Sequence, residues 1–285
     1  MIVGNVENAG LAVPNVELND ANLIPQFGLG VFKLEPAKTE QLVSEALELG
    51  YRHIDTARIY ENEDAVGRAI AASGIPRDEL FVTTKLWNTD HEDPHGAFEA
   101  SLDRLGLEKV DLYLVHWPTP TKRTAVTAWR GLVEILGTGR CDSIGVSNFE
   151  IEHLSQLLNE TGVVPAVNQI ELHPLHQRRD LSAFCAARGI VIEAWGPLGQ
   201  GKTDLLEWPV FAEIAEAHGK TPAQVVLRWH VQRGRIVFPK TSRRERLLEN
   251  ADIFDFVLSD DQLSTIDALD EERRLGLDPY TFEGF

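Results

Sequence analysis

Four ionisable residues stand at or just after the ends of three successive apolar runs of the chain. They are Asp55, Tyr60, Lys85 and His116. In a barrel of parallel strands the carboxyl ends of the strands share one face, and polar residues there are more often catalytic than structural. Each residue taken singly has a commoner role, such as rim packing for the tyrosine or helix capping for the aspartate. Together they supply an acid, a cation, an anion and a neutral donor, a set that suits the reduction of a carbonyl group.

The chemistry of this set can be argued from ordinary pKa values. A phenol has a pKa of about 10, and lowering it by about three units needs roughly 4 kcal/mol of preference for the phenolate. An ammonium group about 4 Å away supplies roughly that much at an effective dielectric near 20. We therefore expect Lys85 to lower the pKa of Tyr60 toward the working pH, and Asp55 to keep Lys85 charged. A neutral His116 would hydrogen-bond a substrate carbonyl oxygen.

Eight short β-branched or apolar runs alternate with segments of helical period from residue 24 onward. The runs cover residues 24–32, 51–57, 80–86, 110–117, 141–149, 163–172, 190–198 and 235–241. The clearest helical segments cover residues 39–50, 97–106 and 124–137. This alternation predicts an α/β protein with a parallel sheet, either a (β/α)8 TIM barrel or an open doubly wound sheet. No G-x-G-x-x-G follows the first run, so we favour the barrel, as a single domain over residues 1–285.

The remaining segments predict additions to the barrel. Two helices fit between the seventh and eighth runs, the second opening at Thr221 and Pro222 as cap and first turn. A further helix is expected over residues 259–269, with Ser259 as its cap. We expect residues 1–14 to be flexible, and residues 270–285 to form an irregular aromatic loop over the mouth of the barrel.

Composition narrows the classes of partner. The chain has 285 residues, 27 basic and 44 acidic side chains and a net charge of −17, which disfavours nucleic acid and anionic membranes as partners. It has two cysteines, Cys141 and Cys185, and its first residues lack the basic and apolar regions of a signal peptide. We expect a soluble, cytoplasmic protein that acts on a small molecule. Nothing in the sequence demands a dimer, so we expect a monomer.

Several strings of the chain resemble the aldo-keto reductase family. They are GYRHIDTARIYENEDAVGRAI, TTKLWN, VDLYLVHWP, SIGVSNF, VNQIELHP, WGPLGQGK and FPKTSRRERLLEN, in order from about residue 24 to residue 250. Within the family the chain is most similar to the 2,5-diketo-D-gluconate reductase-like members of bacteria, notably in EAWGPLGQGK and HGKTPAQVVLRWH. The resemblance implies NADPH-dependent reduction of aldehydes and ketones, with Asp55, Tyr60, Lys85 and His116 as the catalytic tetrad.

The resemblance also implies a set of residues that bind NADPH or NADP⁺. For the nicotinamide carboxamide, the stacked ring and the pyrophosphate these are Ser147, Asn148, Gln169, Trp195, Leu198 and Gly199. For the adenosine 2′-phosphate and the adenine they are Lys240, Thr241, Arg243, Arg246, Glu249 and Asn250. Guanidinium forks and a helix N-terminus suit a phosphate, so a preference for NADPH over NADH also follows physically.

Aromatic residues at the strand ends are candidates for a substrate pocket. The wall would consist of Phe32, Trp87, Trp117 and Phe149, and Tyr280, Phe282 and Phe285 of the tail could close over it. Phe149 stands where diketogluconate reductases can carry histidine. The expected substrates are small carbonyl compounds such as methylglyoxal or, despite this difference, a keto-sugar acid such as 2,5-diketo-D-gluconate.

Other readings of the same residues remain open. A metal-dependent hydrolase on a TIM barrel could use His53, Asp55, His116, Glu171 and His173 as ligands, but this would leave Tyr60, Lys85 and the basic cluster without a task, so we expect no metal. A strand-end lysine could also form a Schiff base, as in an aldolase. The non-enzyme alternative is an NADPH-binding sensor or regulatory subunit on the same fold.

Overall fold

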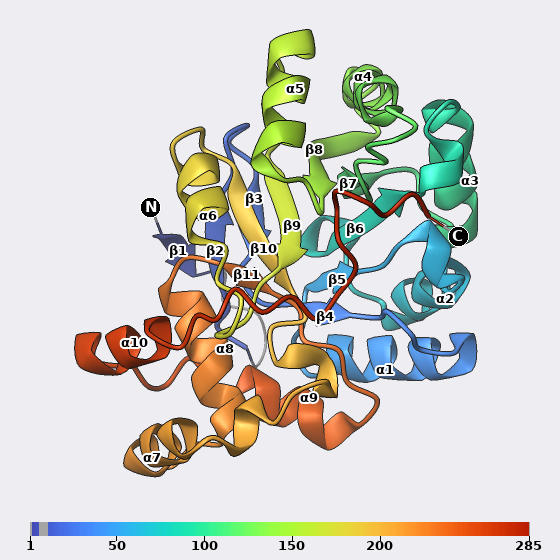
Figure 1. Cartoon of the computed structure of the whole chain (residues 1–285). Coiled ribbons are helices and arrows are strands. Elements are labelled where there is room, and N and C mark those ends of the chain that lie inside the picture. The colour runs from blue at the N-terminus through green and yellow to red at the C-terminus, as the bar shows by residue number, and fades with distance from the viewer. Residues whose placement is uncertain (1, 6–10, 285) are drawn as a thin grey trace.

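The computed structural model describes residues 2–5 and 11–284, and within them eight parallel strands form one curled sheet (Figure 1). In sheet order they are β4 (Leu29–Gly30), β5 (His53–Asp55), β6 (Phe81–Leu86), β7 (Val110–Val115), β8 (Cys141–Ser147), β9 (Val167–Glu171), β10 (Val191–Trp195) and β11 (Ile236–Val237). The two ends of the sheet meet where Phe27 pairs in parallel with Val237. There the amide of Gly28 donates to the Val237 carbonyl at 2.9 Å, and that of Val237 donates to the Gln26 carbonyl at 3.1 Å. The predicted (β/α)8 barrel is confirmed.

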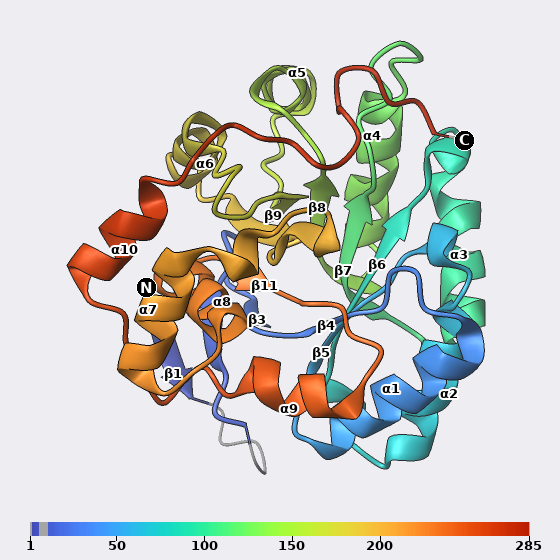
Figure 2. The same ribbon diagram turned by 60° about the horizontal axis from the view of Figure 1, so that its bottom comes forward.

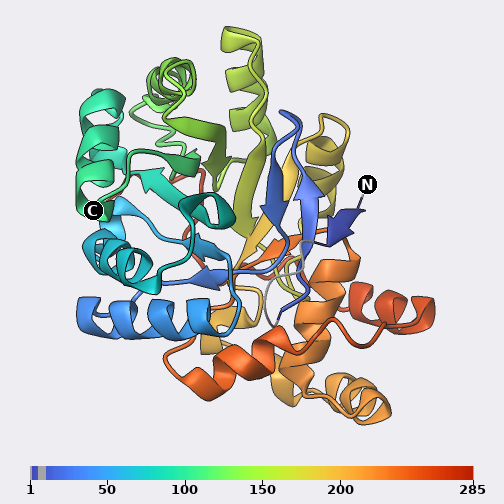
Figure 3. The same ribbon diagram turned by 180° about the vertical axis from the view of Figure 1, so that it is seen from behind.

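Helices surround the barrel and connect its strands (Figures 1 and 3). They are α1 (Pro36–Glu48), α2 (Glu63–Ser73), α3 (Pro94–Leu105), α4 (Ala125–Leu136), α5 (Ile151–Thr161), α6 (Arg179–Ala186), α7 (Pro209–His218), α8 (Pro222–Gln232), α9 (Arg244–Ala251) and α10 (Asp260–Asp267). The two helices expected between the seventh and eighth strands are α7 and α8. Both expected caps are confirmed, because the side chain of Thr221 accepts from the Gln224 amide and that of Ser259 from the Gln262 amide.

The N-terminal part of the chain forms a second, small antiparallel sheet. It contains β1 (Ile2–Asn5), β2 (Pro14–Glu17) and β3 (Leu23–Pro25) and lies at the end of the barrel away from the C-terminal tail (Figure 3). The prediction of one strand over residues 24–32 is therefore wrong, because its first residues pair with β2, whereas Phe27 and β4 join the barrel. Residues 2–5, for which we expected flexibility, pair with β2, whereas residues 1 and 6–10 lie outside the described residues.

Alternate residues of the strands point into the barrel and change from apolar to polar along its axis. At the N-terminal end of β6, β9 and β10 these positions are Phe81, Val167 and Val191, which pack in one apolar cluster. The next positions are Thr83, Gln169 and Glu193, and the last are Lys85, Glu171 and Trp195. The apolar cluster of Phe81, Val167 and Val191 closes the end of the barrel at which the strands begin. The polar groups therefore gather at the other end, where the strands terminate.

Asn62 anchors the loop that contains Tyr60 and connects this loop to the rest of the barrel. It has no exposed surface and is the N-terminal cap residue of α2. Its side-chain oxygen accepts from the hydroxyl of Thr56 at 2.9 Å, and its amide nitrogen donates to the carbonyls of Val31 and Leu34 at 3.0 and 3.3 Å. One buried side chain thus links the end of β5, the loop after β4 and the start of α2.

Replacing this side chain tests how much the loop depends on it. We expect Asn62→Ala to lower the free energy of unfolding by about 3 kcal/mol, because several buried polar groups lose their partner. The measurement is urea denaturation followed by circular dichroism. Asn159→Ala on the exposed side of α5 is the control and should change stability by no more than about 0.5 kcal/mol. Equal effects of the two substitutions would contradict the role given to Asn62.

Among the described residues, no helix is long and apolar enough to cross a membrane.

Candidate active site

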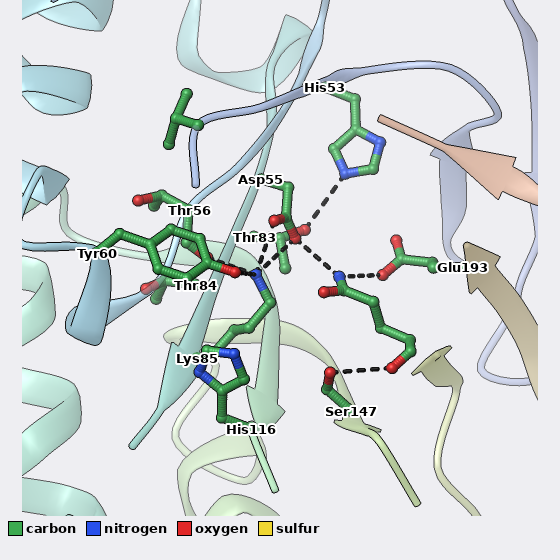
Figure 4. Close-up of polar contacts among 12 residues, drawn as sticks. His53, Asp55, Thr56, Tyr60, Thr83, Thr84, Lys85, His116, Ser147 and Glu193 are labelled. Atoms are coloured by element: carbon green, nitrogen blue, oxygen red, sulfur yellow. Dashed lines mark hydrogen bonds and ion pairs between the residues drawn. The ribbon is translucent and has the colours of Figure 1, made fainter. Parts of the chain in front are cut away.

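Asp55 and Lys85 form a buried ion pair at the ends of two neighbouring strands (Figure 4). The Nζ atom of Lys85 lies 2.7 and 2.8 Å from the two carboxylate oxygens of Asp55 and donates to the Thr56 carbonyl at 2.8 Å. Lys85 has no exposed surface, and Asp55 is 2% exposed. Burial opposes the charge on Lys85, but Asp55, Tyr60 and Glu193 outweigh it and raise the pKa of the lysine. The prediction that Asp55 keeps Lys85 charged is therefore supported by the geometry.

Tyr60 lies beside this pair at the end of a short 3₁₀ helix (Arg58–Tyr60). Its hydroxyl is 3.4 Å from Lys85 Nζ, and the ammonium lies 5.0 Å from the centre of the phenol ring. Burial raises the pKa of Tyr60 to about 12, although Lys85 acts in the opposite direction. The expectation of a net lowering is wrong, because burial disfavours the charged phenolate by more than Lys85 favours it. Tyr60 therefore keeps its proton at neutral pH.

His116 follows β7 and completes the predicted tetrad. Its ring lies edge-on to Tyr60, with ring centres 5.8 Å apart, and edge-on to Trp87 at 5.1 Å. Burial, together with Lys85, holds the pKa of His116 well below its usual value, so the imidazole is neutral. Its carbonyl accepts from the Asn148 side chain at 3.0 Å. Among the described residues its buried Nδ1 atom has no partner. The structure therefore brings all four tetrad residues together.

The residues expected to hold a carboxamide also lie together, at the ends of β8, β9 and β10. The Ser147 hydroxyl donates to the Gln169 carbonyl at 2.9 Å, and the indole nitrogen of Trp195 donates to the Asn148 side-chain oxygen at 2.8 Å. Asn148 has a left-handed backbone with φ of 64°, a conformation that asparagine tolerates better than most residues. Trp195 is half-buried, so part of its indole faces the mouth.

Glu193 is a buried acid that strand-end reasoning missed. It occupies the middle inward position of β10 and has no exposed surface. The side-chain amide of Gln169 donates to Glu193 at 2.9 Å and to Asp55 at 2.8 Å. Burial and then the nearby Asp55 raise the pKa of Glu193 to about 8. Its signal in the sequence is a single acid within the apolar run IVIEAW.

The predicted basic cluster surrounds the start of α9. Lys240, Arg243 and Arg246 are exposed there, and the Thr241 hydroxyl accepts from the Arg243 amide at 3.1 Å. Arg246 lies 2.5 and 2.6 Å from the two carboxylate oxygens of Glu249. Asn250 is buried on the same helix. The six residues expected to bind adenosine and its 2′-phosphate thus lie on one short segment.

The loop after β10 contains several residues with a left-handed backbone conformation. Gly196, Gly199 and Gly201 have φ values of 63°, 73° and 66°. Glycine adopts these values without a Cβ clash, so successive amides can turn toward one side of the loop. Leu198 and Gly199 lie in this loop, and their contact with a pyrophosphate stays a prediction.

The four aromatic residues expected in the pocket wall differ in exposure. Phe32 is 43% exposed and contacts the ring of Tyr60 with centres 4.9 Å apart. Trp87 and Trp117 face Phe282 of the tail, at 6.3 and 4.6 Å between ring centres. Phe149 has no exposed surface and packs in the core, so the structure contradicts its placement on an open wall. The backbone after Ser147 and Asn148 turns this ring inward.

The tail crosses the mouth of the barrel from α10 toward α3 (Figures 1 and 2). Glu171 accepts from the amides of Leu275 and Gly276 at 2.6 and 2.9 Å, and Glu283 accepts from the amides of Thr121 and Lys122 at 2.6 and 3.3 Å. Tyr280 is exposed and its hydroxyl donates to Glu152. The expectation of a C-terminal loop over the mouth agrees with this course, whereas Phe285 lies outside the described residues.

The residues that a hydrolytic metal would need are engaged elsewhere. His53 is buried with its Nδ1 atom 3.2 Å from the Pro25 carbonyl, and His173 lies 3.2 Å from Glu171, which holds the tail. Within the described residues, no group of three or more His, Cys, Asp or Glu side chains could hold a metal ion. The structure therefore gives no support to the hydrolase reading.

Removing the carboxylate of Glu171 should free one end of the tail. We expect Glu171→Ala to speed amide hydrogen exchange at Leu275 and Gly276 at least about tenfold, because both amides lose a charged acceptor. Hydrogen exchange read by mass spectrometry checks this. Glu271→Ala, at an exposed acid of the tail itself, is the control. Unchanged protection in the Glu171 variant would show that the tail is held by other contacts.

Comparisons with known proteins agree with this geometry. The model of the aldo/keto reductase family matches residues 26–271. An aldo-keto reductase of Mycolicibacterium smegmatis is 53% identical over 271 residues, with 94% of this chain and 98% of the relative covered. A methylglyoxal reductase DkgA of Yersinia pestis is 50% identical over 269 residues, covering 94% and 97%. A crystal structure of a Gox0644 variant in complex with NADPH has a TM-score of 0.91 and 46% identity, covering 95% and 99%. The chain therefore belongs to the aldo/keto reductase family.

Proposed function

We propose that the protein is an NADPH-dependent reductase that converts small aldehydes and ketones to alcohols, with Tyr60 as the proton donor. The observation that carries the proposal is the arrangement of a protonated phenol, a buried ammonium and a neutral imidazole at one mouth. The Tyr60 hydroxyl lies 3.4 Å from Lys85 Nζ, and its ring is edge-on to His116. Family membership and the NADPH of the related Gox0644 structure support the same reading.

The residues present fit a nicotinamide dinucleotide phosphate. Ser147, Asn148 and Gln169 offer hydroxyl and amide groups, which suit a neutral carboxamide, next to the half-buried Trp195. At the other end of the site, Lys240, Arg243 and Arg246 offer exposed cations where the whole chain carries a charge of −17. When bound, the reduced nicotinamide supplies the hydride for the carbonyl carbon.

The protein side chains then direct the proton and the substrate oxygen. Neutral His116 would donate a hydrogen bond to the carbonyl oxygen and orient it toward the Tyr60 hydroxyl. Tyr60 would donate its proton to that oxygen as negative charge develops there. Lys85, kept charged by Asp55, would stabilise the phenolate that remains. The Lys85 ammonium would thus have little effect on the protonated phenol before the reaction, and would stabilise the phenolate after proton transfer.

The mouth favours a compact substrate. Phe282 of the tail faces Trp87 and Trp117, which limits the room above the tetrad. A small 2-oxoaldehyde such as methylglyoxal fits this enclosure better than 2,5-diketo-D-gluconate, and relatives from Yersinia pestis and Escherichia coli are named methylglyoxal reductases. We keep the keto-sugar acid as the second substrate to test, because the exposed Lys33 and Arg123 flank this end of the barrel.

We also propose that the protein acts as a cytoplasmic monomer. Both cysteines are buried and unpaired, and burial raises the pKa of Cys141 to about 12 and that of Cys185 to about 11, so neither is a reactive thiolate. All four tetrad residues come from one chain. These observations are consistent with a reducing compartment and with a site that needs no second subunit.

The proton donor can be tested by removing one oxygen atom. We expect Tyr60→Phe to lower kcat for methylglyoxal at least about 100-fold while NADPH affinity changes less than about twofold, because only the general acid is lost. Tyr113→Phe is the matched control, since the Tyr113 hydroxyl is buried and has no partner among the described residues. Loss of NADPH absorbance measures turnover. Retained turnover in the Tyr60 variant would refute the assignment, and NADPH binding without turnover of any carbonyl by the wild type would favour a sensor.

The cofactor preference depends on the basic cluster. We expect Arg246→Ala to weaken NADPH binding about 10- to 100-fold and NADH binding less than about twofold, because only NADPH has the 2′-phosphate that a guanidinium fork would hold. Fluorescence titration measures both affinities. Arg244→Ala is the control, because Arg244 lies on the same helix and pairs with Glu48 at 3.2 Å. Equal losses for both cofactors would show that Arg246 acts on the fold rather than on the phosphate.

A further inference from the structure

Glu193 is the one acid of the buried network that the proposed reaction does not use. It lies beside Gln169 on the adjacent strand, in direct register across β9 and β10. Its side chain and that of Gln169 are both almost fully buried, and neither reaches the surface of the protein. A charged side chain in such a position costs several kcal/mol unless it is paired, so its retention there calls for a physical reason.

The hydrogen bonds around Gln169 supply that reason. Its side-chain nitrogen donates at 2.8 Å to Asp55 Oδ2 and at 2.9 Å to Glu193 Oε2. An amide nitrogen has two hydrogens, so these two acceptors use both of them. The amide can then turn neither its nitrogen toward the mouth nor its oxygen toward Asp55 without losing a buried bond. Only the oxygen of Gln169 remains for a ligand.

The charges of the network decide the protonation of Glu193. The groups that face it are Asp55 from β5, Lys85 from β6 and Gln169 from β9, and the ammonium of Lys85 is already held by both oxygens of Asp55. An ionised Glu193 would be a second buried anion with no cation of its own, in agreement with its pKa of about 8. At neutral pH it is therefore a carboxylic acid. Its Oε1 atom, buried without a partner among the described residues, can carry the proton.

We propose that Glu193 is a positioning residue: it holds the Gln169 amide between two carboxyl groups, so that the amide oxygen receives the nicotinamide carboxamide and the amide nitrogen steadies Asp55. The inference rests on the proposed function, because it takes the carboxamide as the group that Gln169 binds. It assigns no proton transfer to Glu193, which acts only through Gln169.

Two substitutions separate the hydrogen bond from the ionisation of Glu193. Glu193→Leu removes the acceptor, and Glu193→Gln keeps an acceptor oxygen but cannot ionise. The probes are NADPH, NADP⁺ and adenosine 2′,5′-bisphosphate, titrated by calorimetry without any carbonyl substrate. The bisphosphate reports on the adenosine end alone. Ile192→Val, a mild change at the preceding buried position of β10, is the control for disturbance of the strand.

The leucine variant tests positioning. We expect Glu193→Leu to weaken NADPH about tenfold and to leave the bisphosphate within about twofold of the wild type, because only the carboxamide end loses its fixed partner. Unchanged NADPH affinity, or equal weakening of both ligands, would overturn the proposal. If this variant does not fold, Glu193→Met, which also removes the acceptor, takes its place with the same expected result.

The glutamine variant tests the ionisation. Between about pH 7 and pH 9 the wild type would acquire a negative charge at Glu193, and the oxidised nicotinamide is a cation whereas the reduced one is neutral. Lys85, Tyr60, His53 and His116 do not titrate in this window, since their pKa values lie above or below it. We expect the preference for NADPH over NADP⁺ to fall several-fold in the wild type and to stay constant in Glu193→Gln. An identical pH response in both proteins would overturn the proposal. Failure of the wild type to bind NADPH at all would instead refute the proposed function.

Discussion

The buried ion pair between Lys85 and Asp55 is the interaction on which the mouth of this barrel depends. An ammonium with no exposed surface is stable only if its charge is matched, and here both carboxylate oxygens and one backbone carbonyl surround it at 2.7 to 2.8 Å. Breaking such a pair from one side costs about 3–5 kcal/mol, because an uncompensated charge remains. The strands β5 and β6 are adjacent and parallel, with Asp55 in register with Thr83, so Lys85 lies two residues further along β6 and its long side chain reaches the Asp55 carboxylate. The arrangement of these two strands therefore stabilises the buried charge of Lys85.

The same ion pair influences the protonation state of Tyr60. Lys85 donates its hydrogen bonds to Asp55 and Thr56 and lies 3.4 Å from the phenol oxygen. The effect of burial on Tyr60 is therefore larger than that of the ammonium, and the pKa of Tyr60 rises to about 12. Since that pKa is raised, the protonated phenol persists as pH increases through the neutral range. Under the proposed mechanism, Tyr60 is therefore in its donor form before the reaction, and Lys85 would stabilise the phenolate once it forms. The proposed mechanism does not require Lys85 to lower the pKa of Tyr60 before the reaction.

Strand-end reasoning predicted the barrel and brought Asp55, Lys85 and His116 to one rim, because parallel strands fix where their last residues lie. Other features depend on contacts that no local pattern encodes. Glu193 stands mid-strand, where alternation alone does not tell an inward acid from an outward one. Phe149 follows Asn148, which has a left-handed backbone, and its ring packs in the core rather than on the wall. The pKa of Tyr60 depends on how much water the neighbouring side chains exclude. The assignment of individual cofactor and substrate contacts remains a prediction.

The tail is held at its two ends and contributes Phe282 to the wall of the mouth. Backbone amides bound to Glu171 and Glu283 hold those ends by charge-assisted hydrogen bonds, which are stronger than neutral ones. Between them, Leu277 and Tyr280 are 46% and 48% exposed, while Phe282 alone faces both tryptophans of the wall. Phe282 and the two tryptophans thus bound the space above the tetrad on the side of the tail. Under the proposed function, this aromatic boundary would influence which carbonyl compounds enter, whereas the chemistry would depend on the buried pair of Lys85 and Asp55.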